Sequence, residues 1–125
     1  LDQERAKDFY VNKLGLEVKM EIPIGPEANW LTVAAKDQPD MEITLMPVNN
    51  NELVPAESAG KLAELIESGT FGFGVFGSVD IYATYEELQQ KGVEFTKPPT
   101  EEFYGIEAMF KDDSGNWFSL VQRKD

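Results

Sequence analysis

The sequence contains no histidine and no cysteine among its 125 residues. Without histidine, the chain has no imidazole general base, no histidine-based catalytic triad and no histidine metal ligand. Without cysteine, it has no disulfide framework, no thiol nucleophile and no thiolate metal site. A cytoplasmic protein fits this composition, and we expect the chemistry of the chain to depend on other side chains.

Basic residues are also scarce, since 11 Lys and Arg stand against 23 Asp and Glu, for a net charge of −12. Phosphate contacts require a basic surface, so nucleic acid is not an expected partner. No apolar run approaches the roughly 20 residues that span a bilayer, so no membrane association is expected. With 42% hydrophobic and 27% charged residues, the composition is that of one globular domain over residues 1–125.

Two stretches of the chain repeat one order of predicted elements. In the first, a helix runs from an N-cap at Asp2 to a stop at Gly15. Strands are predicted after it over residues 16–23, 29–35 and 41–47. In the second stretch, a strand over 71–79 leads into a helix capped by Asp80. Strands are predicted after that helix over residues 93–95, 105–111 and 116–122.

The two stretches also share sequence, which indicates an internal duplication. LGLEV at 14–18 matches KGVEF at 91–95, and AAKDQPDMEITL at 34–45 matches MFKDDSGNWFSL at 109–120. The repeated unit is β-α-β-β-β, with a first module over 1–48, a connector with a short helix over 49–70, and a second module over 71–125. The first strand of the first module is missing, and we expect it upstream of Leu1.

Alternation along each predicted strand separates a core face from a second face. The core face is expected to carry Leu31, Val33, Ala35, Met41, Ile43, Leu45, Ile106, Ala108, Phe110, Phe118 and Leu120. The second face is expected to carry Trp30, Thr32, Glu42, Thr44, Glu107, Met109, Trp117 and Ser119. A face that mixes aromatic side chains with a few polar groups suits a small-molecule pocket or a dimer interface, and one sheet can serve both.

Three phrases in order, DQERAKDFYVNKLGLEV, ATYEELQQKGVEF and EFYGIEAMFKDDSGNWFSLVQ, resemble the helices and closing hairpin of the vicinal oxygen chelate superfamily. This is the glyoxalase, bleomycin resistance and dioxygenase group. The resemblance implies an α+β fold in which two tandem βαβββ modules form a curved mixed sheet with a concave cavity. It does not by itself imply an activity.

Metal-dependent relatives hold a divalent ion with His and Glu ligands from the first and last strands of each unit. The corresponding positions here are Thr44, Phe73 and Ser119, and the fourth position lies in the missing strand. Phenylalanine cannot ligate a metal, and neutral hydroxyls hold a catalytic divalent ion poorly. We therefore expect no metal cofactor of the usual kind.

The resemblance then favours a metal-free homodimer that binds a small molecule, as resistance-type members do. Its ligand-binding residues would be Trp30, Thr32, Glu42, Thr44, Phe73, Tyr104, Glu107, Met109, Trp117 and Ser119. Two alternatives stay open. One is a lyase or isomerase in which Glu42 or Glu107 acts as a general base with a raised pKa, or in which the pair holds Mg²⁺ or Ca²⁺. The other is an interaction protein whose dimer interface uses the whole face.

Overall fold

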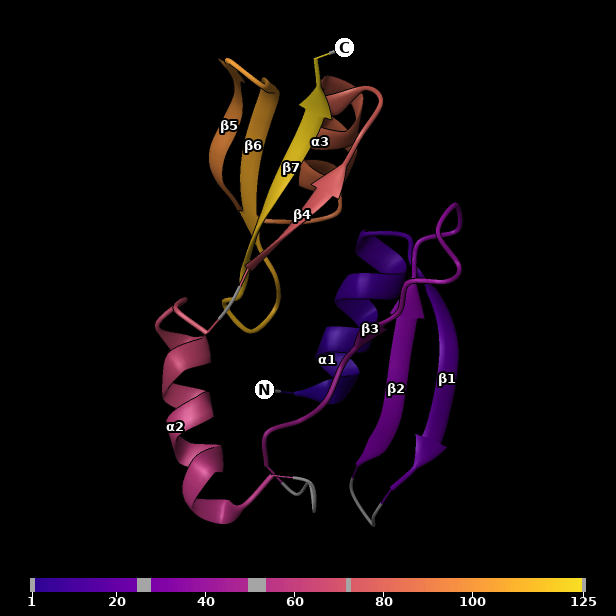
Figure 1. The fold of residues 1–125 in the computed structure, drawn as a ribbon, viewed down its shortest axis with the longest axis vertical. Coiled ribbons are helices and arrows are strands. Elements are labelled where there is room, and N and C mark those ends of the chain that lie inside the picture. The colour runs from indigo at the N-terminus through magenta and orange to yellow at the C-terminus, as the bar shows by residue number, and fades with distance from the viewer. Residues whose placement is uncertain (1, 25–27, 50–53, 72, 125) are drawn as a thin grey trace.

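The computed structural model describes residues 2–24, 28–49, 54–71 and 73–124, and it has the predicted α+β architecture (Figure 1). Its elements in chain order are α1 (Gln3–Lys7), the π-helical turn η1 (Asp8–Lys13), β1 (Glu17–Pro23), β2 (Asn29–Ala34), β3 (Ile43–Thr44), α2 (Ala56–Glu67), β4 (Phe73–Gly77), α3 (Ile81–Gln90), β5 (Phe95–Glu102), β6 (Gly105–Lys111) and β7 (Trp117–Arg123). No helix within these ranges is both long and apolar enough to cross a membrane.

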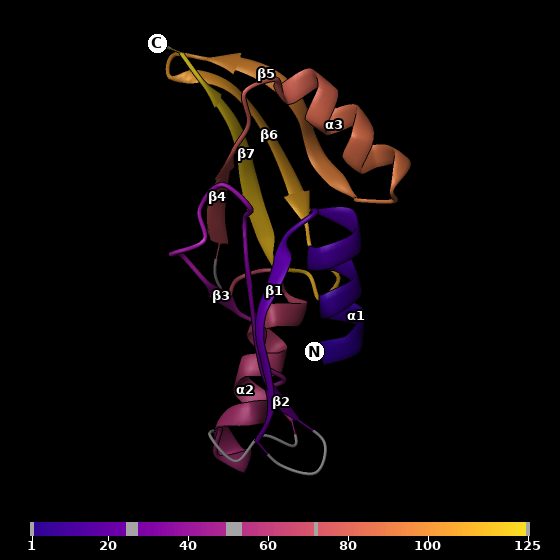
Figure 2. The ribbon, with the colours of Figure 1, turned by 90° about the vertical axis from the view of Figure 1, so that its right-hand side faces the viewer.

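The strands form two sheets. Sheet A has the order β1-β2-β3 and is antiparallel. Sheet B has the order β4-β7-β6-β5 and is mixed, because β4 runs parallel to β7 while the other pairs are antiparallel. The sheets lie toward opposite ends of an elongated molecule, with α1 and α3 on the same side of it (Figure 1, Figure 2). The curved surface predicted from the sequence is therefore divided between two sheets.

The first helix begins at the predicted cap, where the Asp2 side chain accepts a hydrogen bond from the Arg5 amide at 3.1 Å. After five residues, the helix widens into η1, which the helical spacing did not predict. There the Leu14 amide donates to the Phe9 carbonyl five residues earlier, as in a π-helix. The wider turn buries both Phe9 and Tyr10, whose rings pack edge to face at 5.2 Å.

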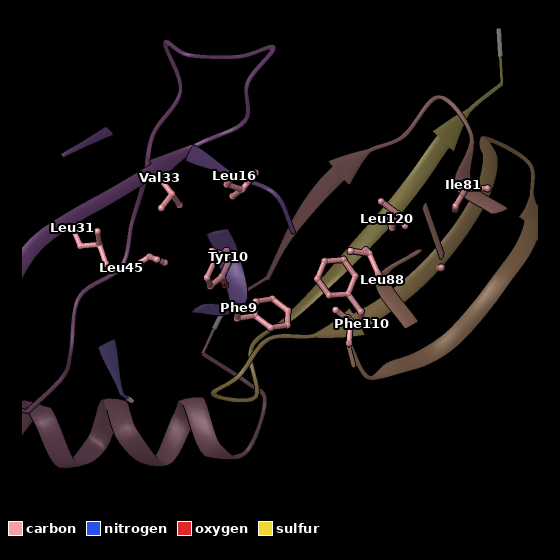
Figure 3. Packing of buried hydrophobic residues seen from close by; sticks show 12 residues of the cluster. Phe9, Tyr10, Leu16, Leu31, Val33, Leu45, Ile81, Leu88, Phe110 and Leu120 are labelled. Atoms are coloured by element: carbon pink, nitrogen blue, oxygen red, sulfur yellow. The ribbon is translucent and has the colours of Figure 1, made fainter. Parts of the chain in front are cut away.

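One hydrophobic core joins the two sheets. Its buried members are Phe9, Tyr10, Leu16, Leu31, Val33, Leu45, Ile81, Leu88, Val93, Ala108, Phe110 and Leu120. Figure 3 shows Phe9 and Tyr10 between the sheet A side chains and the sheet B side chains. The Phe9 ring lies 6.4 Å from that of Phe110, and the Tyr10 ring lies 6.3 Å from that of Phe118. The first helix therefore supplies the residues that bind the two sheets to each other.

Strands β3 and β5 differ from the prediction in ways that the structure explains, and β4 covers Phe73–Gly77 instead of the predicted 71–79. β3 covers only Ile43–Thr44, and Met41 is 67% exposed instead of facing the core. The reason is that Met41 still belongs to the preceding turn, since its amide donates to the Gln38 carbonyl. β5 is longer than predicted and runs through Pro98 and Pro99. Prolines are tolerated there because β5 is an edge strand of sheet B.

β3 and β7 occupy corresponding places in the two sheets. β7 has β6 on one edge and β4 on the other, whereas β3 pairs only with β2 in the described part of the chain.

A cavity of about 430 Å³ is lined by residues 43–48, by α2 and by the β6–β7 turn. Two buried acceptors of that turn, Asp113 Oδ1 and Asn116 Oδ1, have no hydrogen-bond partner among the residues that the structure describes. Burial raises the pKa of Asp113. A cavity with both apolar and polar walls thus lies beside β3.

The turn between β6 and β7 is organised by the carboxylate of Asp112. Its Oδ1 accepts hydrogen bonds from the amides of Ser114, Gly115 and Asn116, each at 2.9 Å. Its Oδ2 accepts from the Tyr10 hydroxyl at 2.8 Å and from the side-chain amide nitrogen Nδ2 of Asn116 at 3.0 Å. Burial, together with the charge of this carboxylate, raises the pKa of Tyr10 well above its usual value. One side chain therefore closes the hairpin and ties it to the first helix.

We expect Tyr10→Phe to lower the free energy of unfolding by about 1–3 kcal/mol, because it removes a buried hydrogen bond to a charged group. Urea denaturation followed by circular dichroism measures the change. Tyr82→Phe is the matched control, since Tyr82 is 55% exposed and should leave the unfolding midpoint unchanged. Equal midpoints for the two variants would contradict the role given to the Tyr10–Asp112 bond.

Candidate functional site

Side chains on β6 and β7 alternate between two faces of sheet B. Ala108 and Phe110 point into the core beneath α3, so their neighbours along the strand point the other way. We call this second face the open face of sheet B. It carries four of the predicted site residues, Glu107, Met109, Trp117 and Ser119. The sequence alternation therefore predicted their common face.

Glu107 is the centre of a hydrogen-bond network on this face. Its Oε2 accepts from the Ser119 hydroxyl at 2.6 Å. Its Oε1 accepts from the Tyr104 hydroxyl at 2.7 Å and from Lys97 Nζ at 3.0 Å. Lys97 Nζ also lies 3.6 Å from a carboxylate oxygen of Glu102. Strands β5, β6 and β7 and the β5–β6 turn each contribute a residue, so the register of the sheet assembles the network.

The donors around Glu107 determine its charge. Hydrogen bonds from Ser119, then Tyr104, then Lys97 lower the pKa of Glu107 to about 2, against a smaller opposing effect of burial. The same contacts raise the pKa of Tyr104 and of Lys97, in each case chiefly through the hydrogen bond to Glu107. The carboxylate is therefore ionised at neutral pH, and the lysine beside it is protonated.

A hollow of about 320 Å³ lies next to this network. Its walls come from the open face of sheet B, from the last residues of α2 and from the β6–β7 turn. They are Glu67, Ser68, Gly69, Thr96, Met109, Lys111, Gly115 and Trp117. Met109 follows Glu107 on the same face of β6, so the hollow and the charged network are neighbours on one surface.

The other predicted site residues lie on sheet A. The buried Thr32 hydroxyl donates to Glu42 Oε1 at 2.5 Å, and Thr44 is the cross-strand partner of Thr32. Trp30 is 36% exposed and pairs across β1–β2 with Ile22, which is 51% exposed. The sequence predicted Thr32 on the second face of its strand, away from the core, and in the structure Thr32 is only 3% exposed. Sheet A therefore presents exposed apolar side chains and one hydroxyl–carboxylate pair.

The predicted residues thus fall into two groups on two sheets. Phe73 pairs through its backbone with Trp117 on sheet B, but its side chain lies outside the described part of the structure. Lys97 is a site residue that the sequence pattern did not predict, because the strand predicted over 93–95 ended before it. A lysine on an edge strand beside two prolines was the only available signal.

The side chains present do not fit a metal centre of the kind that the resemblance implies. The Ser119 hydroxyl, at one ligand position, donates its proton to Glu107, and Thr44 is an exposed hydroxyl on sheet A. Glu42 and Glu107 are each held by donors of their own sheet. Among the residues that the structure describes, no three or more carboxylates gather into a group able to hold a metal ion.

Comparison with known proteins places this architecture in a family. A family model for the Glyoxalase/Bleomycin resistance protein/Dioxygenase superfamily matches residues 2–120. The uncharacterized protein YetH of Bacillus subtilis (strain 168) is 34% identical over 121 residues, which are 97% of this chain and 89% of YetH. The match therefore extends over nearly all of both proteins.

Two solved structures are similar in both fold and sequence. The crystal structure of UcmS2 is 46% identical, with a TM-score of 0.88, and the match covers 97% of this chain and 90% of that one. TnmS3, described as an antibiotic binding protein from Streptomyces sp. CB03234, is 29% identical with a TM-score of 0.68. That match covers 99% of this chain and 88% of TnmS3.

The lowered pKa of Glu107 predicts how stability depends on pH. A carboxyl group with a lower pKa in the folded state stabilises the fold fully above its ordinary pKa, near 4.5, and this contribution is lost as the pH falls to about 2. We expect the difference in unfolding free energy between wild type and Glu107→Gln to shrink between pH 4.5 and 2. Urea denaturation at several pH values measures it, and a difference that stays constant would refute the network.

Proposed function

Since the chain belongs to the glyoxalase/bleomycin resistance protein/dioxygenase superfamily, we propose that it binds a small aromatic compound without a metal ion and sequesters it as a cytoplasmic homodimer. The observation that carries the proposal is the open face of sheet B. There the hollow walled by Met109 and Trp117 adjoins the ionised carboxylate of Glu107. An apolar surface with a few fixed polar groups is typical of small-molecule sites.

The similar structures support the class of ligand. TnmS3 is described as an antibiotic binding protein, and it matches this chain over nearly its whole length at 29% identity. The hollow of about 320 Å³ lies at the lower end of the volumes of small-molecule sites, which bury most of the ligand surface. We therefore propose that the ligand also contacts a second surface.

A homodimer would supply that surface. On sheet A, Met20, Ile22 and Trp30 are 41%, 51% and 36% exposed, and the β1–β2 register places Ile22 opposite Trp30. Exposed apolar side chains gathered on one sheet are characteristic of interfaces. In the proposed dimer, the face of sheet A that carries Met20, Ile22 and Trp30 in one protomer covers the open face of sheet B in its partner. Trp30, Thr32, Glu42 and Thr44 would then join the ligand site.

The network around Glu107 does not favour acid–base catalysis. A general base at neutral pH needs a pKa near the working pH, and the alternative role of Glu107 assumed that burial raises its pKa. In the structure, three donors lower it to about 2 instead. The carboxylate is therefore suited to hold a ligand in a fixed orientation, and we propose binding as the function.

Trp117 gives a direct test of the proposed site. In a Trp30→Phe background, Trp117 is the sole tryptophan, because the chain has two tryptophans. We expect polycyclic aromatic antibiotics to quench its fluorescence in a saturable way, with one site per protomer, because the ring walls the hollow. Native mass spectrometry of the same samples should show ligand-bound dimers.

The control for this experiment is Trp117→Phe with Trp30 retained. It should keep the dimer but bind the same compounds at least several-fold more weakly, since a smaller ring fills less of the hollow. Loss of the dimer with unchanged ligand affinity would instead assign Trp117 to the interface. Failure of every compound to bind the wild-type dimer would refute the proposed function.

The metal-free part of the proposal has its own test. Calorimetric titration of chelator-treated protein with Mn²⁺, Ni²⁺ and Zn²⁺ should show no tight stoichiometric binding, because Thr44, Phe73 and Ser119 stand where relatives have ligands. The same titration of Glu107→Gln should give the same result. Tight binding that depends on Glu107 would show that this carboxylate is a metal ligand.

A further inference from the structure

The Tyr104 and Ser119 hydroxyl groups, which both donate to Glu107 on the open face of sheet B, have no proton to offer a ligand. We propose that Tyr104, supported by Ser119, selects ligands that bring hydrogen-bond donors, so that the ligand class is an uncharged aromatic compound with phenolic hydroxyl or N–H groups. This inference rests on the proposed function, since it concerns the same face. It adds that the ligand carries hydrogen-bond donors, and it identifies Tyr104 as the residue that accepts from them.

The argument begins with the number of protons. A hydroxyl has one proton to donate and lone pairs to accept with, whereas an ionised carboxylate only accepts. The Tyr104 proton lies in the 2.7 Å hydrogen bond to Glu107 Oε1, and the Ser119 proton lies in the 2.6 Å bond to Oε2. Both hydroxyl oxygens therefore present only lone pairs to any further partner.

This polarity cannot reverse at neutral pH. For either hydroxyl to donate to a ligand, it would have to leave the carboxylate, which would lose a charge-assisted hydrogen bond. A protonated Glu107 would relax this constraint, but the same donors hold its pKa at about 2. The pattern of acceptors is therefore a fixed property of the surface.

Tyr104 is the member of the network that a ligand can reach. It is 39% exposed in the β5–β6 turn, whereas Ser119 is 7% exposed beneath Glu107. An aromatic ligand over Met109 and Trp117 would lie on the same face as the Tyr104–Glu107 pair. Tyr104 is therefore the specificity-determining residue, and Ser119 helps to hold the carboxylate that orients it.

Charge excludes a second class of ligand. Lys97 is the only donor of the network with protons to spare, and it already lies 3.0 Å from Glu107 and 3.6 Å from Glu102. Two carboxylates thus surround one ammonium, in a chain whose net charge is −12. A carboxylate ligand at the Glu107 network would meet two carboxylates and gain only a shared cation, so we expect it to bind weakly there.

Matched probes test the inference. 2-Naphthol and 2-methoxynaphthalene share one ring system, but only the first can donate a hydrogen bond. We expect 2-naphthol to bind wild type about 5–10-fold more tightly, as one buried hydrogen bond near 1 kcal/mol provides. The hydrophobic effect alone predicts the opposite order, because the methyl ether is the more apolar probe. 2-Naphthoate should bind more weakly than either. Calorimetric titration of wild type with each probe measures all three affinities.

Variants assign the preference to its residue. In Tyr104→Phe the ratio of the 2-naphthol affinity to the 2-methoxynaphthalene affinity should fall to 1 or below, while affinity for 2-methoxynaphthalene changes less than about twofold. In Glu107→Gln the ratio should also fall, because an amide can donate and leaves the hydroxyls free to rotate. Tyr82→Phe, on the exposed side of α3, is the control and should keep the wild-type ratio.

The outcomes separate the two proposals. Equal affinity of wild type for 2-naphthol and 2-methoxynaphthalene, or a ratio that survives Tyr104→Phe, would overturn the donor selection while leaving small-molecule binding in place. Failure of all three probes to bind wild type would overturn the proposed function, and the donor selection with it. Circular dichroism of each variant confirms that lost binding is not lost folding.

Discussion

The carboxylate of Asp112 is the interaction on which the arrangement of the molecule depends. Three backbone amides and one side-chain amide hold it in the β6–β7 turn, and the Tyr10 hydroxyl ties it to the first helix. The bond joins segments 102 residues apart in the chain. Because Tyr10 also belongs to the shared core, the position of sheet B relative to α1 depends on this contact together with the packing of Phe9 on Phe110.

The hairpin that Asp112 closes packs against the core with one face and carries part of the Glu107 network on the other. Leu120 points inward and is 3% exposed, so it fixes the register of β7 against the core. The same register places Ser119 opposite Met109 and brings its hydroxyl to Glu107. A slip of one residue would exchange the two faces and cost the burial of the core face. The stability of the core therefore determines the geometry of the polar network.

This coupling explains what the sequence could predict. Alternation with period two correctly placed Glu107, Met109, Trp117 and Ser119 on one face, and caps at Asp2 and Asp80 correctly marked the helix starts. It could not predict which partners the polar groups choose. The pattern did not predict Lys97, because the predicted strand ended before Pro98 and Pro99. β5 continues through these prolines, since an edge strand needs no hydrogen-bond donor on its outer side. The alternation of residues also did not predict the burial of Thr32, because a local pattern carries no information on which residues cover a sheet face.

Where the resemblance implies a metal ligand, this chain has Ser119, and that difference changes what the nearby carboxylate can do. Its hydroxyl, with Tyr104 and Lys97, provides Glu107 with the partners that a partly buried anion requires. A carboxylate with three donors keeps its charge and its orientation, and it takes up a proton only in strong acid. Such a group exchanges protons poorly at neutral pH, but it costs little to cover with a ligand, because its own donors already replace water. The same contacts that argue against catalysis therefore suit Glu107 to organise a binding surface.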